Sequence, residues 1–541
     1  MKRAVALILA LVLTMALVAC GGDKPASTPG STSETTSTPG NTLDINTPVI
    51  PSSPSTPTEN ATYVKDLVVS TAAITLDPNL TWSTTREFYN KMVFDTLIHR
   101  SDVTGEVEMR LAKTVEWANA ECTKIHVVLN ENAVFSNGDK VTSADVEFSF
   151  GRCGYGSMNS YYDSCEIISD TELYVNLKSS NSAFMPILSR SCCAIVSKAA
   201  AEKNPDGQAL IGSGPWMYDM STYVANSTIT LVRNEKYWGE YENPTETVRV
   251  VQIADASARA IALQSGEIHL AFDLNTTELP LVKKNDKLVV NEFASMSFGY
   301  IGFNDHRNTD ALTEEDINLR RAVACAIKKE DVMIATGNDG GQTMVSMWPF
   351  IEDAYIANEG DYEHDLSYNP EKAKEYLAKA GGKNELTCLI VSSSASSKTA
   401  GQVVQEYCRQ VGITINFMEV DGTGFTALVK TENPAYDMFV WNNLFVVDVV
   451  NWNYFLTTST VNRALINSSV INAAIEKIKT SSDDAIRTEQ LQIIQKEVHK
   501  NVSYIPMYWS TKNVAYAKGL EGIEVSAMPT YDTNNIRLRT N

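Results

Sequence analysis

The sequence predicts a mixed α/β chain whose globular part begins near residue 61. Residues 64–74 and 124–130 alternate β-branched side chains with others, which is typical of strands. Residues 317–333 and 369–381 repeat apolar side chains at helical spacing. No repeat period, and no parallel alternation long enough for a barrel, is present in the sequence. We therefore expect strands and helices to alternate along one chain without an obvious internal boundary.

The segment NPEKAKEYLAKAG at 369–381 carries the clearest helix signals. Asn369 is a residue type that caps helix N-termini, Pro370 suits the first helical position, and Gly381 follows the expected end. Asp145 in VTSADVEF is likewise typical of a helix start rather than of a catalytic acid.

Composition and charge limit the partners of the chain. Of its 541 residues, 44% are hydrophobic and 20% are charged, and the formal net charge is −20. At roughly 100–200 residues per domain, this length predicts two to four domains. So acidic a chain repels the phosphates of nucleic acids and anionic lipid headgroups, and no basic stripe offsets the repulsion. We therefore exclude nucleic acid as a partner.

The N-terminus is organised as an export signal. The residues MKR precede an apolar run at 4–19, which is shorter than the ~20 residues needed to span a bilayer. LVAC at 17–20 resembles the lipobox of bacterial lipoproteins, in which the cysteine is acylated and the leader is cut before it. This resemblance implies a signal peptide at 1–19 and a lipid anchor on Cys20. A plain secretory signal that contains a cysteine is the alternative.

The segment after the export signal has the composition of a linker. Residues 21–60 are almost entirely Ser, Thr, Pro, Gly and Asn, which cannot bury a core, and the prolines extend the chain. We predict that 20–60 is a lipidated, disordered spacer. No second apolar run of spanning length follows. We expect the protein to be tethered to the outer face of the cell membrane, in an envelope of the Gram-positive type.

No catalytic motif stands out in the sequence. The six histidines are isolated from one another, and none forms an HExxH pair. The segment GSGPW at 212–216 is not a nucleophile elbow, because Ser213 lies between the glycines. A phosphate-binding loop is also missing. We predict a protein that is not an enzyme and has no catalytic residue and no cofactor.

The cysteines leave the question of disulfides open. Eight remain besides Cys20, and their spacing shows no compact disulfide framework. Cys192 and Cys193 are adjacent, a geometry that rarely bridges without strain. A bridge between Cys153 and Cys165 is one alternative. No CxxC pair and no neighbouring histidine supports zinc, so we predict no metal site.

Residues 93–150 resemble the opening of the extracellular solute-binding proteins of family 5, the peptide-binding receptors of ABC importers. The matching positions are Gly105, Leu111, Ala112, Trp117, the strand at 124–130, Phe135, Gly138, Thr142, Ala144, Asp145, Val146, Phe148 and Ser149. Seven further segments follow in the order of the family: GSGPWMY (212–218), NEKYWGE (234–240), ARAIALQSGEIHLAF (258–272), YIGFN (300–304), LRRAVACAIKKEDVM (319–333), YNPEKAKEYLAKAG (368–381) and YIPMYW (504–509). Each segment alone is a weak signal, whereas together they extend the resemblance over roughly residues 60–541.

The resemblance implies a two-lobed α/β clamshell of the type II periplasmic-binding-protein kind, with two crossover segments and a ligand enclosed between the lobes. The first lobe would comprise 61–303 and 503–541, with an extra subdomain near 93–209, and the second lobe would comprise 304–502. Hinge closure around the ligand is the expected motion. The hinge residues would be Tyr300, Asn304, Ile505 and Pro506.

The resemblance also implies a ligand-binding aspartate. In the peptide-binding members, an aspartate within a W-x-x-D-x-x-[DN]-P segment pairs with the α-ammonium group of the peptide. Asp448 matches this aspartate, Phe445 the aromatic position and Asn451 the second polar site. Trp452 stands in place of the proline, and the spacing back to Tyr436 is longer than in the family pattern. Either a ligand completes a charge-assisted pair with Asp448, or Asp448 pairs with an internal Arg or Lys or caps a turn.

Aromatic and amide side chains supply the other candidates for the pocket. Aromatic faces offer contact area that tolerates different ligand sequences, and amides can bind a peptide backbone. The candidates are Trp441, Asn442, Asn443, Trp348, Trp82 and Tyr161, with packing in the core as the alternative for each aromatic residue.

These expectations combine into one predicted function. We expect a monomeric, lipid-anchored receptor that captures peptides and delivers them to the permease subunits of an ABC transporter. The same fold could instead bind another solute, such as a nickel chelate, an oligosaccharide or an opine, or could serve as a surface peptide sensor. An exported hydrolase is disfavoured because catalytic motifs are missing.

Overall fold

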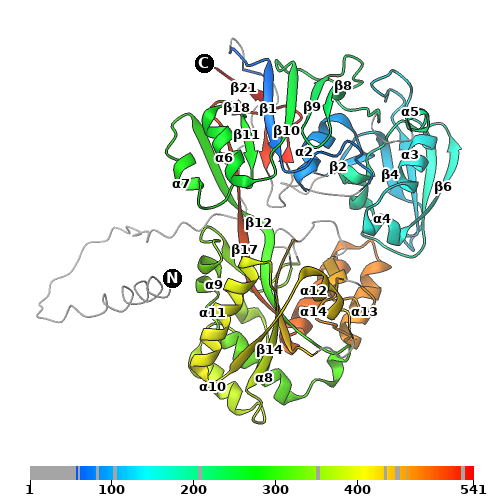
Figure 1. Cartoon of the computed structure of the whole chain (residues 1–541). Helices are drawn as coiled ribbons and strands as arrows, with labels where there is room; N and C mark the ends of the chain where they lie inside the picture. Colours follow the sequence, from blue (N-terminus) through cyan, green and yellow to red (C-terminus); the bar gives the residue numbers. More distant parts are fainter. Residues whose placement is uncertain are drawn as a thin grey trace, which may run out of the picture. The chain divides into compact units, whose positions relative to one another are not determined.

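The computed structural model describes residues 57–58, 61–80, 84–100, 107–204, 210–348, 354–431, 435–444, 451–459, 461–525 and 531–540 (Figure 1). The predicted signal peptide, Cys20 and nearly all of the predicted spacer lie outside these residues. None of the described helices combines the length and the apolar character that a membrane crossing requires.

One sheet of 11 strands organises the described part of the chain, in the order β15-β14-β16-β12-β17-β11-β1-β10-β9-β8, with β13 paired to β17. Its two long strands, β12 (Leu288–Phe303) and β17 (Tyr504–Ala517), pair antiparallel and join two segments of the sheet. The first segment holds β11 (Leu270–Phe272), β1 (Asp66–Thr71), β10 (Thr247–Gln252), β9 (Thr228–Arg233) and β8 (Trp216–Val224). The second holds β16 (Met438–Leu444), β14 (Glu385–Val391) and β15 (Thr414–Val420), while β13 is Gln342–Thr343.

Helices cover both faces of the first sheet segment. Successive side chains of its strands therefore pack into two different cores, one on each face. Leu67 and Val69 of β1 belong to the core that contains helix α2 (Thr84–Val93). Val68, which points to the other face, packs against the core of α6 (Ala256–Ser265) and α7 (Leu279–Val282). The C-terminal residues add the short strands β18 (Leu520–Glu521), β19 (Glu524–Val525), β20 (Tyr531–Asp532) and β21 (Arg537–Leu538) to this part.

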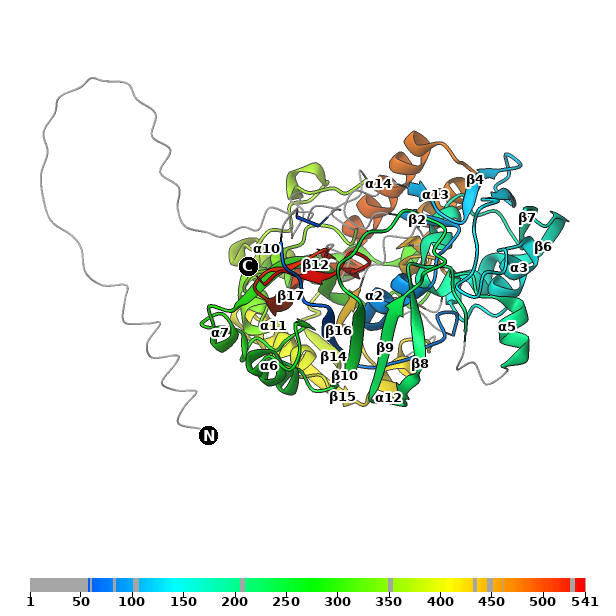
Figure 2. The same ribbon diagram turned by 90° about the horizontal axis from the view of Figure 1, so that it is seen from above.

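A separate four-stranded sheet lies beside β8 and β9, as Figures 1 and 2 show from two directions. Its order is β4-β5-β7-β6, and all pairs in it are antiparallel. Its strands are β4 (Ala112–Trp117), β5 (Lys124–Leu129), β6 (Tyr162–Ser169) and β7 (Glu172–Leu177). Around them lie the hairpin of β2 (Ile98–Arg100) and β3 (Val107–Met109), helices α3 (Ser143–Gly151), α4 (Gly156–Tyr161) and α5 (Lys198–Lys203), and the 3-10 turns η1 (Met185–Ser189) and η2 (Ser191–Cys193).

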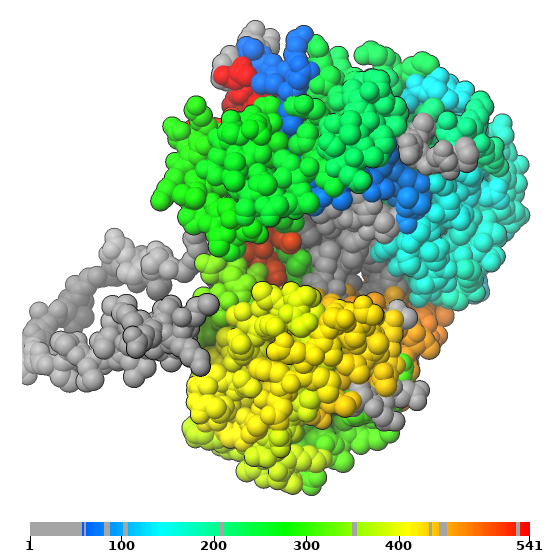
Figure 3. Space-filling view, in the orientation of Figure 1, coloured from blue at the N-terminus to red at the C-terminus, as the bar shows by residue number. Residues whose placement is uncertain are grey.

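The second sheet segment is also covered on both faces. Met438 and Val440 of β16 belong to the core formed with α8 (Glu314–Ala326), α9 (Lys329–Ala335) and α11 (Ala395–Val411), whereas Phe439 contacts Phe425 of α12 (Gly422–Leu428). Figure 3 shows α10 and α11 (yellow) on the surface of this segment. The remaining elements are α10 (Pro370–Ala378), α13 (Ser469–Lys479), α14 (Asp484–Asn501), η3 (Thr309–Ala311), η4 (Glu359–Asp361) and η5 (Asn451–Tyr454).

Two of the predicted helix starts are confirmed in detail. The side chain of Asn369 accepts a hydrogen bond from the backbone N–H of Lys372 at 3.0 Å, and Pro370 is the first helical residue of α10. The carboxylate of Asp145 accepts hydrogen bonds from the backbone N–H and the hydroxyl of Thr142, which completes a capping box at the start of α3.

The segment 317–333, predicted to be one helix, forms two. Helix α8 ends at Ala326, Ile327 takes an extended conformation, and α9 begins at Lys329. The break keeps Ile327 buried in the core and directs the Lys329 ammonium group to the carbonyl oxygen of Met344, at 2.8 Å. Apolar periodicity continues across the break, so the pattern alone could not reveal it.

Glycines in β12 make room for aromatic rings that pack over the strand. A Cβ atom on Gly299 would lie 2.5 Å from Cζ of Tyr508, and one on Gly302 would lie 2.2 Å from Cζ of Phe439. Any larger residue would therefore displace a buried ring of a neighbouring strand. This close packing explains the glycine of the YIGFN segment.

A buried ion pair lies where both long strands meet the second sheet segment. The carboxylate of Asp305, two residues after β12, binds the guanidinium of Arg320 on α8 at 2.6 Å, and the two side chains are 0% and 8% exposed. The same carboxylate accepts hydrogen bonds from the hydroxyls of Thr309 and of Ser503, the residue just before β17. Arg320 also donates to the carbonyl oxygen of Asn304. The charges are thus paired and hydrogen-bonded, which a buried ion pair needs.

We predict that Asp305→Ala lowers the free energy of unfolding by about 3–5 kcal/mol, because it leaves the Arg320 charge buried without its partner. Urea denaturation followed by circular dichroism measures the change. Lys374→Ala, which removes an exposed pair with Glu371, is the control and should cost less than about 0.5 kcal/mol. Equal losses in both variants would contradict the role given to the buried pair.

Candidate ligand-binding site

Strand β16 carries the predicted pocket residues and occupies an inner position in the sheet. It pairs antiparallel with β12, where Tyr300 lies opposite Trp441, and parallel with β14, where Leu389 lies opposite Phe439. An inner strand that is covered on both faces buries a continuous apolar run, and MFVW at 438–441 is such a run. The sheet therefore fixes the backbone at Trp441.

Trp441 lies between an aromatic ring and a cation. Its ring stacks on Phe425 of α12, with centroids 4.2 Å apart and planes 13° apart. The guanidinium carbon of Arg463 lies 5.2 Å from the centroid of the Trp441 ring, a cation–π distance. Trp441 itself is half-buried, so part of its surface can contact another molecule.

Arg463 has hydrogen-bonding capacity that the described residues do not fill. Its Nη1 atom is buried and has no hydrogen-bond partner within the described ranges, and no carboxylate there forms an ion pair with it. A buried, charged donor of this kind is costly unless an acceptor satisfies it. A carboxylate or carbonyl oxygen placed beside Trp441 would supply that acceptor. Sequence reasoning missed Arg463, because an isolated arginine in VNRALIN carries no pattern.

Asn442 does not share the surface of Trp441. Successive side chains of a strand point to opposite faces, and Nδ2 of Asn442 donates to the hydroxyl of Ser396 on α11 at 2.6 Å. Asn442 is exposed on that other face. The backbone of Asn443 pairs with Phe298. The structure therefore separates two candidates that the sequence had grouped.

Two other aromatic candidates lie within the core. Trp348 is 1% exposed and stacks on Phe455, with centroids 6.3 Å apart. Tyr161, at the end of α4, is buried beside Trp452, the residue at the position of the family proline. Burial raises the pKa of Tyr161, and the neighbouring indole N–H of Trp452 opposes this shift. In this conformation both Trp348 and Tyr161 serve as packing residues, while their role as pocket walls stays a prediction.

The region of Tyr161 is also hydrogen-bonded to helix α13. The N–H and the hydroxyl of Ser182 donate to the carbonyl oxygens of Lys479 and Ile478 near the end of α13. Nε1 of Trp452 is buried close to the Tyr161 hydroxyl, where it opposes the rise in the pKa of that group, but it makes no well-aligned hydrogen bond with the residues that the structure describes.

Three predicted pocket residues lie outside the described residues: Asp448, Phe445 and Trp82. The assignment of Asp448 to the ammonium-binding aspartate of the family therefore stays a prediction. In sequence, Asp448 lies between the end of β16 and the start of η5, which are both described and which carry Trp441 and Trp452.

The predicted hinge residues occupy the paired ends of the two long strands. Tyr300 lies opposite Pro506, and Ile301 lies opposite Ile505, within the antiparallel pairing of β12 and β17. The register shifts at Gly299/Tyr300, which is a local irregularity in the ladder. Asn304 follows β12, and its backbone N–H donates to Asp437. Whether these residues bend during closure stays a prediction.

We predict that Arg463→Met changes the free energy of unfolding by less than about 1 kcal/mol, because methionine keeps the packing on Trp441 and leaves unpaired no buried partner among the described residues. The same variant should retain less ligand than the wild type when both are purified identically and compared by native mass spectrometry. Arg409→Met, which breaks an exposed pair with Glu406, is the matched control and should retain ligand normally. A loss of several kcal/mol in Arg463→Met would instead show a structural role.

Two known proteins are similar to this chain over most of its length. The chain is 24% identical over 503 residues to a probable D,D-dipeptide-binding periplasmic protein of Escherichia coli, covering 87% of this chain and 94% of the relative. It is also 24% identical over 492 residues to the oligopeptide-binding protein AppA of Bacillus subtilis, covering 82% of this chain and 85% of that protein.

The fold is that of solved structures of the same kind. HbpA2 from Haemophilus parasuis superimposes with a TM-score of 0.76 at 19% identity, covering 88% of this chain and all of that chain. The mixed α/β architecture with its large sheet is thus the two-lobed type II periplasmic-binding-protein fold, which confirms the predicted fold class.

The family assignment follows from the main body of the sequence. The pattern of the bacterial extracellular solute-binding proteins, family 5 (middle region), matches residues 106–464, which include β16 and Arg463. The chain therefore belongs to the bacterial extracellular solute-binding proteins of family 5.

Proposed function

We propose that this solute-binding protein is a receptor for short peptides, which it captures outside the cell and delivers to the permease of an ABC transporter. The observation that carries the proposal is the half-buried Trp441 with the Arg463 guanidinium over its ring and a buried Nη1 that lacks an acceptor among the described residues. The two relatives compared above are named as peptide-binding proteins, which supports the same solute class.

The charged groups at the two ends of a peptide match two residues of the proposed site. Its α-ammonium group would pair with Asp448, and its terminal carboxylate or a backbone carbonyl oxygen would accept from Arg463. Trp441, which stacks on the buried ring of Phe425, would contact the peptide through aromatic surface, which does not select a particular side chain. The net result is recognition of the zwitterionic backbone, with broad tolerance of sequence.

Binding requires no covalent chemistry in this proposal. Members of the family are substrate-binding proteins, and the groups named here bind and orient a solute without reacting with it. The lobes would comprise 61–303 with 503–541, and 304–502, and closure would bend the paired strands near Tyr300 and Pro506. The ion pair of Asp305 and Arg320 would keep the junction with the second lobe rigid during this motion.

The membrane attachment is part of the proposal and rests on the sequence. Acylation of Cys20, after cleavage of residues 1–19, would anchor a monomer to the outer face of the membrane. The Ser/Thr/Pro-rich spacer would then let the receptor reach both the solute and the permease.

Native mass spectrometry of the freshly purified protein tests the solute class directly. We expect a mixture of bound masses that fragment into short peptides, because closed receptors of this kind retain ligand. A single sugar, a metal chelate or another non-peptide compound would overturn the peptide assignment while leaving the solute-binding role intact.

We predict that Asp448→Ala weakens binding of tripeptides with a free amine by about 30-fold or more, because a buried charge pair is lost. N-acetylated tripeptides lack the ammonium group, so their affinity should change little. Isothermal titration calorimetry with both ligands measures the difference. Equal loss for both, or no loss for either, would remove Asp448 from the ammonium site.

The proposed acylation of Cys20 can be tested separately. Cells that express the wild type should incorporate a clickable palmitate analogue into the protein, whereas Cys20→Ser should abolish the label and release the protein into the medium. Continued labelling of Cys20→Ser would contradict lipidation at this residue.

A further inference from the structure

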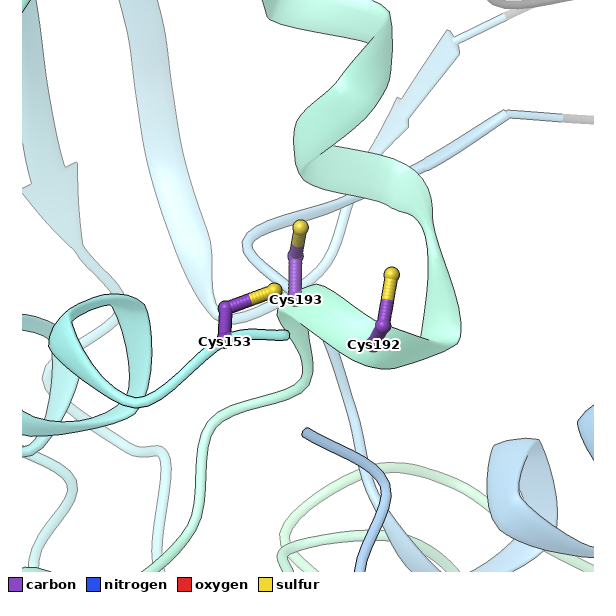
Figure 4. A group of neighbouring side chains, drawn as sticks. All are labelled: Cys153, Cys192 and Cys193. Atoms are coloured by element: carbon purple, nitrogen blue, oxygen red, sulfur yellow. The ribbon is translucent and has the colours of Figure 1, made fainter. Parts of the chain in front are cut away.

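Three cysteines that the sequence keeps apart form one buried cluster. The sulfur atoms of Cys153, Cys192 and Cys193 all lie within 4.8 Å of one another, and these residues are 3%, 0% and 0% exposed. Cys153 follows α3, whereas Cys192 and Cys193 belong to the 3-10 turn η2. Figure 4 shows the two segments meeting, with the Cys153 side chain directed towards Cys193.

A polar frame around Asn79 holds the two segments together. The side-chain Nδ2 of Asn79 donates to the backbone carbonyl oxygens of Cys192 and Ala194, at 2.9 Å each. The backbone carbonyl oxygen of Asn79 accepts a hydrogen bond from the N–H of Gly154 at 2.6 Å. A Cβ atom on Gly154 would lie 1.9 Å from the carbonyl oxygen of Leu80, so only glycine permits this approach. The cluster is therefore a fixed feature of the fold rather than a chance encounter of side chains.

The electrostatic surroundings make the three thiols unequal. Hydrogen bonds from the Cys192 and Cys193 thiols lower the pKa of Cys153 below its usual value, whereas burial raises the pKa values of Cys192 and Cys193. Cys153 is thus the thiol that becomes the thiolate most readily, and the thiolate is the nucleophile in thiol chemistry.

The charge balance favours a disulfide over a bound metal ion. Three thiolates around a monovalent soft cation would leave two uncompensated negative charges in the core, and zinc would lack a fourth ligand. The nearby buried carboxylate of Glu87 already pairs with the ammonium group of Lys91 at 3.2 Å, so this lysine does not offset the charge of the thiolates. A disulfide is neutral, and members of this family are extracellular, where disulfides persist.

We propose that Cys153 forms a disulfide with either Cys192 or Cys193, and that the third thiol of the cluster can exchange into this bond. The Cys153 thiolate attacks one sulfur of a low-molecular-weight disulfide, whose S–S bond breaks and releases one thiol after protonation. The thiolate of Cys192 or Cys193 then attacks the sulfur of Cys153 and releases the second thiol. Two electrons pass from the cysteine pair to the external disulfide, and two protons go to its thiols. Because the cluster is buried, this reaction occurs while the region folds or opens.

The proposal replaces the bridge left open by the sequence. Cys165 does not belong to the cluster; its sulfur accepts a hydrogen bond from the Tyr162 hydroxyl at 3.6 Å, and burial raises its pKa to about 11. A bond from Cys153 to Cys192 or Cys193 would instead close a loop that contains α4, β6, β7 and η1. This loop carries Tyr161, so the crosslink would stabilise the region that packs on Trp452.

Peptide mapping tests the proposal on the full chain in a Cys165→Ser background. After equilibration with oxidised glutathione and alkylation of the remaining thiols, trypsin should yield peptide 153–178 linked to peptide 191–198. Additional Cys192→Ser and Cys193→Ser variants should each keep the link, because either sulfur can serve as the partner. Cys153→Ser and the double variant Cys192→Ser with Cys193→Ser should lose it.

The melting temperature provides a second test of the disulfide that does not depend on peptide mapping. Reduction with dithiothreitol should lower the melting temperature of the Cys165→Ser protein by several degrees and leave that of Cys153→Ser/Cys165→Ser unchanged. Four results would overturn the proposal: full alkylation of all three thiols, a bond only between Cys192 and Cys193, a bond from Cys153 to a cysteine outside the cluster, or a metal ion in the native mass of an unlinked protein. Circular dichroism of each variant shows whether it has folded.

Discussion

The buried ion pair between Asp305 and Arg320 is the constraint on which the rest of the structure depends. It joins the end of β12, the middle of α8 and, through Ser503, the start of β17. Both connections between the sheet segments are therefore fixed at one point. Because β16 pairs along β12, the same junction determines where Trp441 lies. The geometry of the candidate site thus follows from a charge pair that contacts no ligand.

Successive side chains of β16 point to opposite faces of the sheet, and this alternation determines which of them lie close together. Trp441 and Phe439 face the core with α12, where Phe425 and Arg463 surround the tryptophan ring. Asn442 faces α11 instead, and its side-chain amide donates a hydrogen bond to Ser396 of that helix. Within the described residues, the Arg463 guanidinium has unfilled hydrogen-bonding capacity beside a half-buried tryptophan. In the proposed receptor, these two side chains would act as a charged anchor and a permissive aromatic wall, which suit a solute with a constant backbone and variable side chains.

Local features could be read from the sequence, because they depend on neighbouring residues. The cap at Asn369, the capping box of Thr142 and Asp145, and the family order of segments all belong to this class, and the fold class followed from that order. The break at Ile327, the cation over Trp441 and the cysteine cluster could not be read in the same way. Each depends on contacts between segments far apart in the chain, and Arg463 lies 22 positions from Trp441, outside every motif that the sequence offers. The sequence alone also could not show that Asn442 and Trp441 face opposite sides of the sheet, because that requires knowledge of the strand and its neighbours.

The central claim is that a peptide binds against Trp441 with an oxygen atom satisfying Arg463. A crystal structure of the protein with its retained ligand tests this most directly. The account predicts continuous density for a peptide backbone in contact with the Trp441 ring, and a ligand oxygen within about 3 Å of a guanidinium nitrogen of Arg463. A ligand without peptide bonds, or a peptide bound away from both residues, would contradict it.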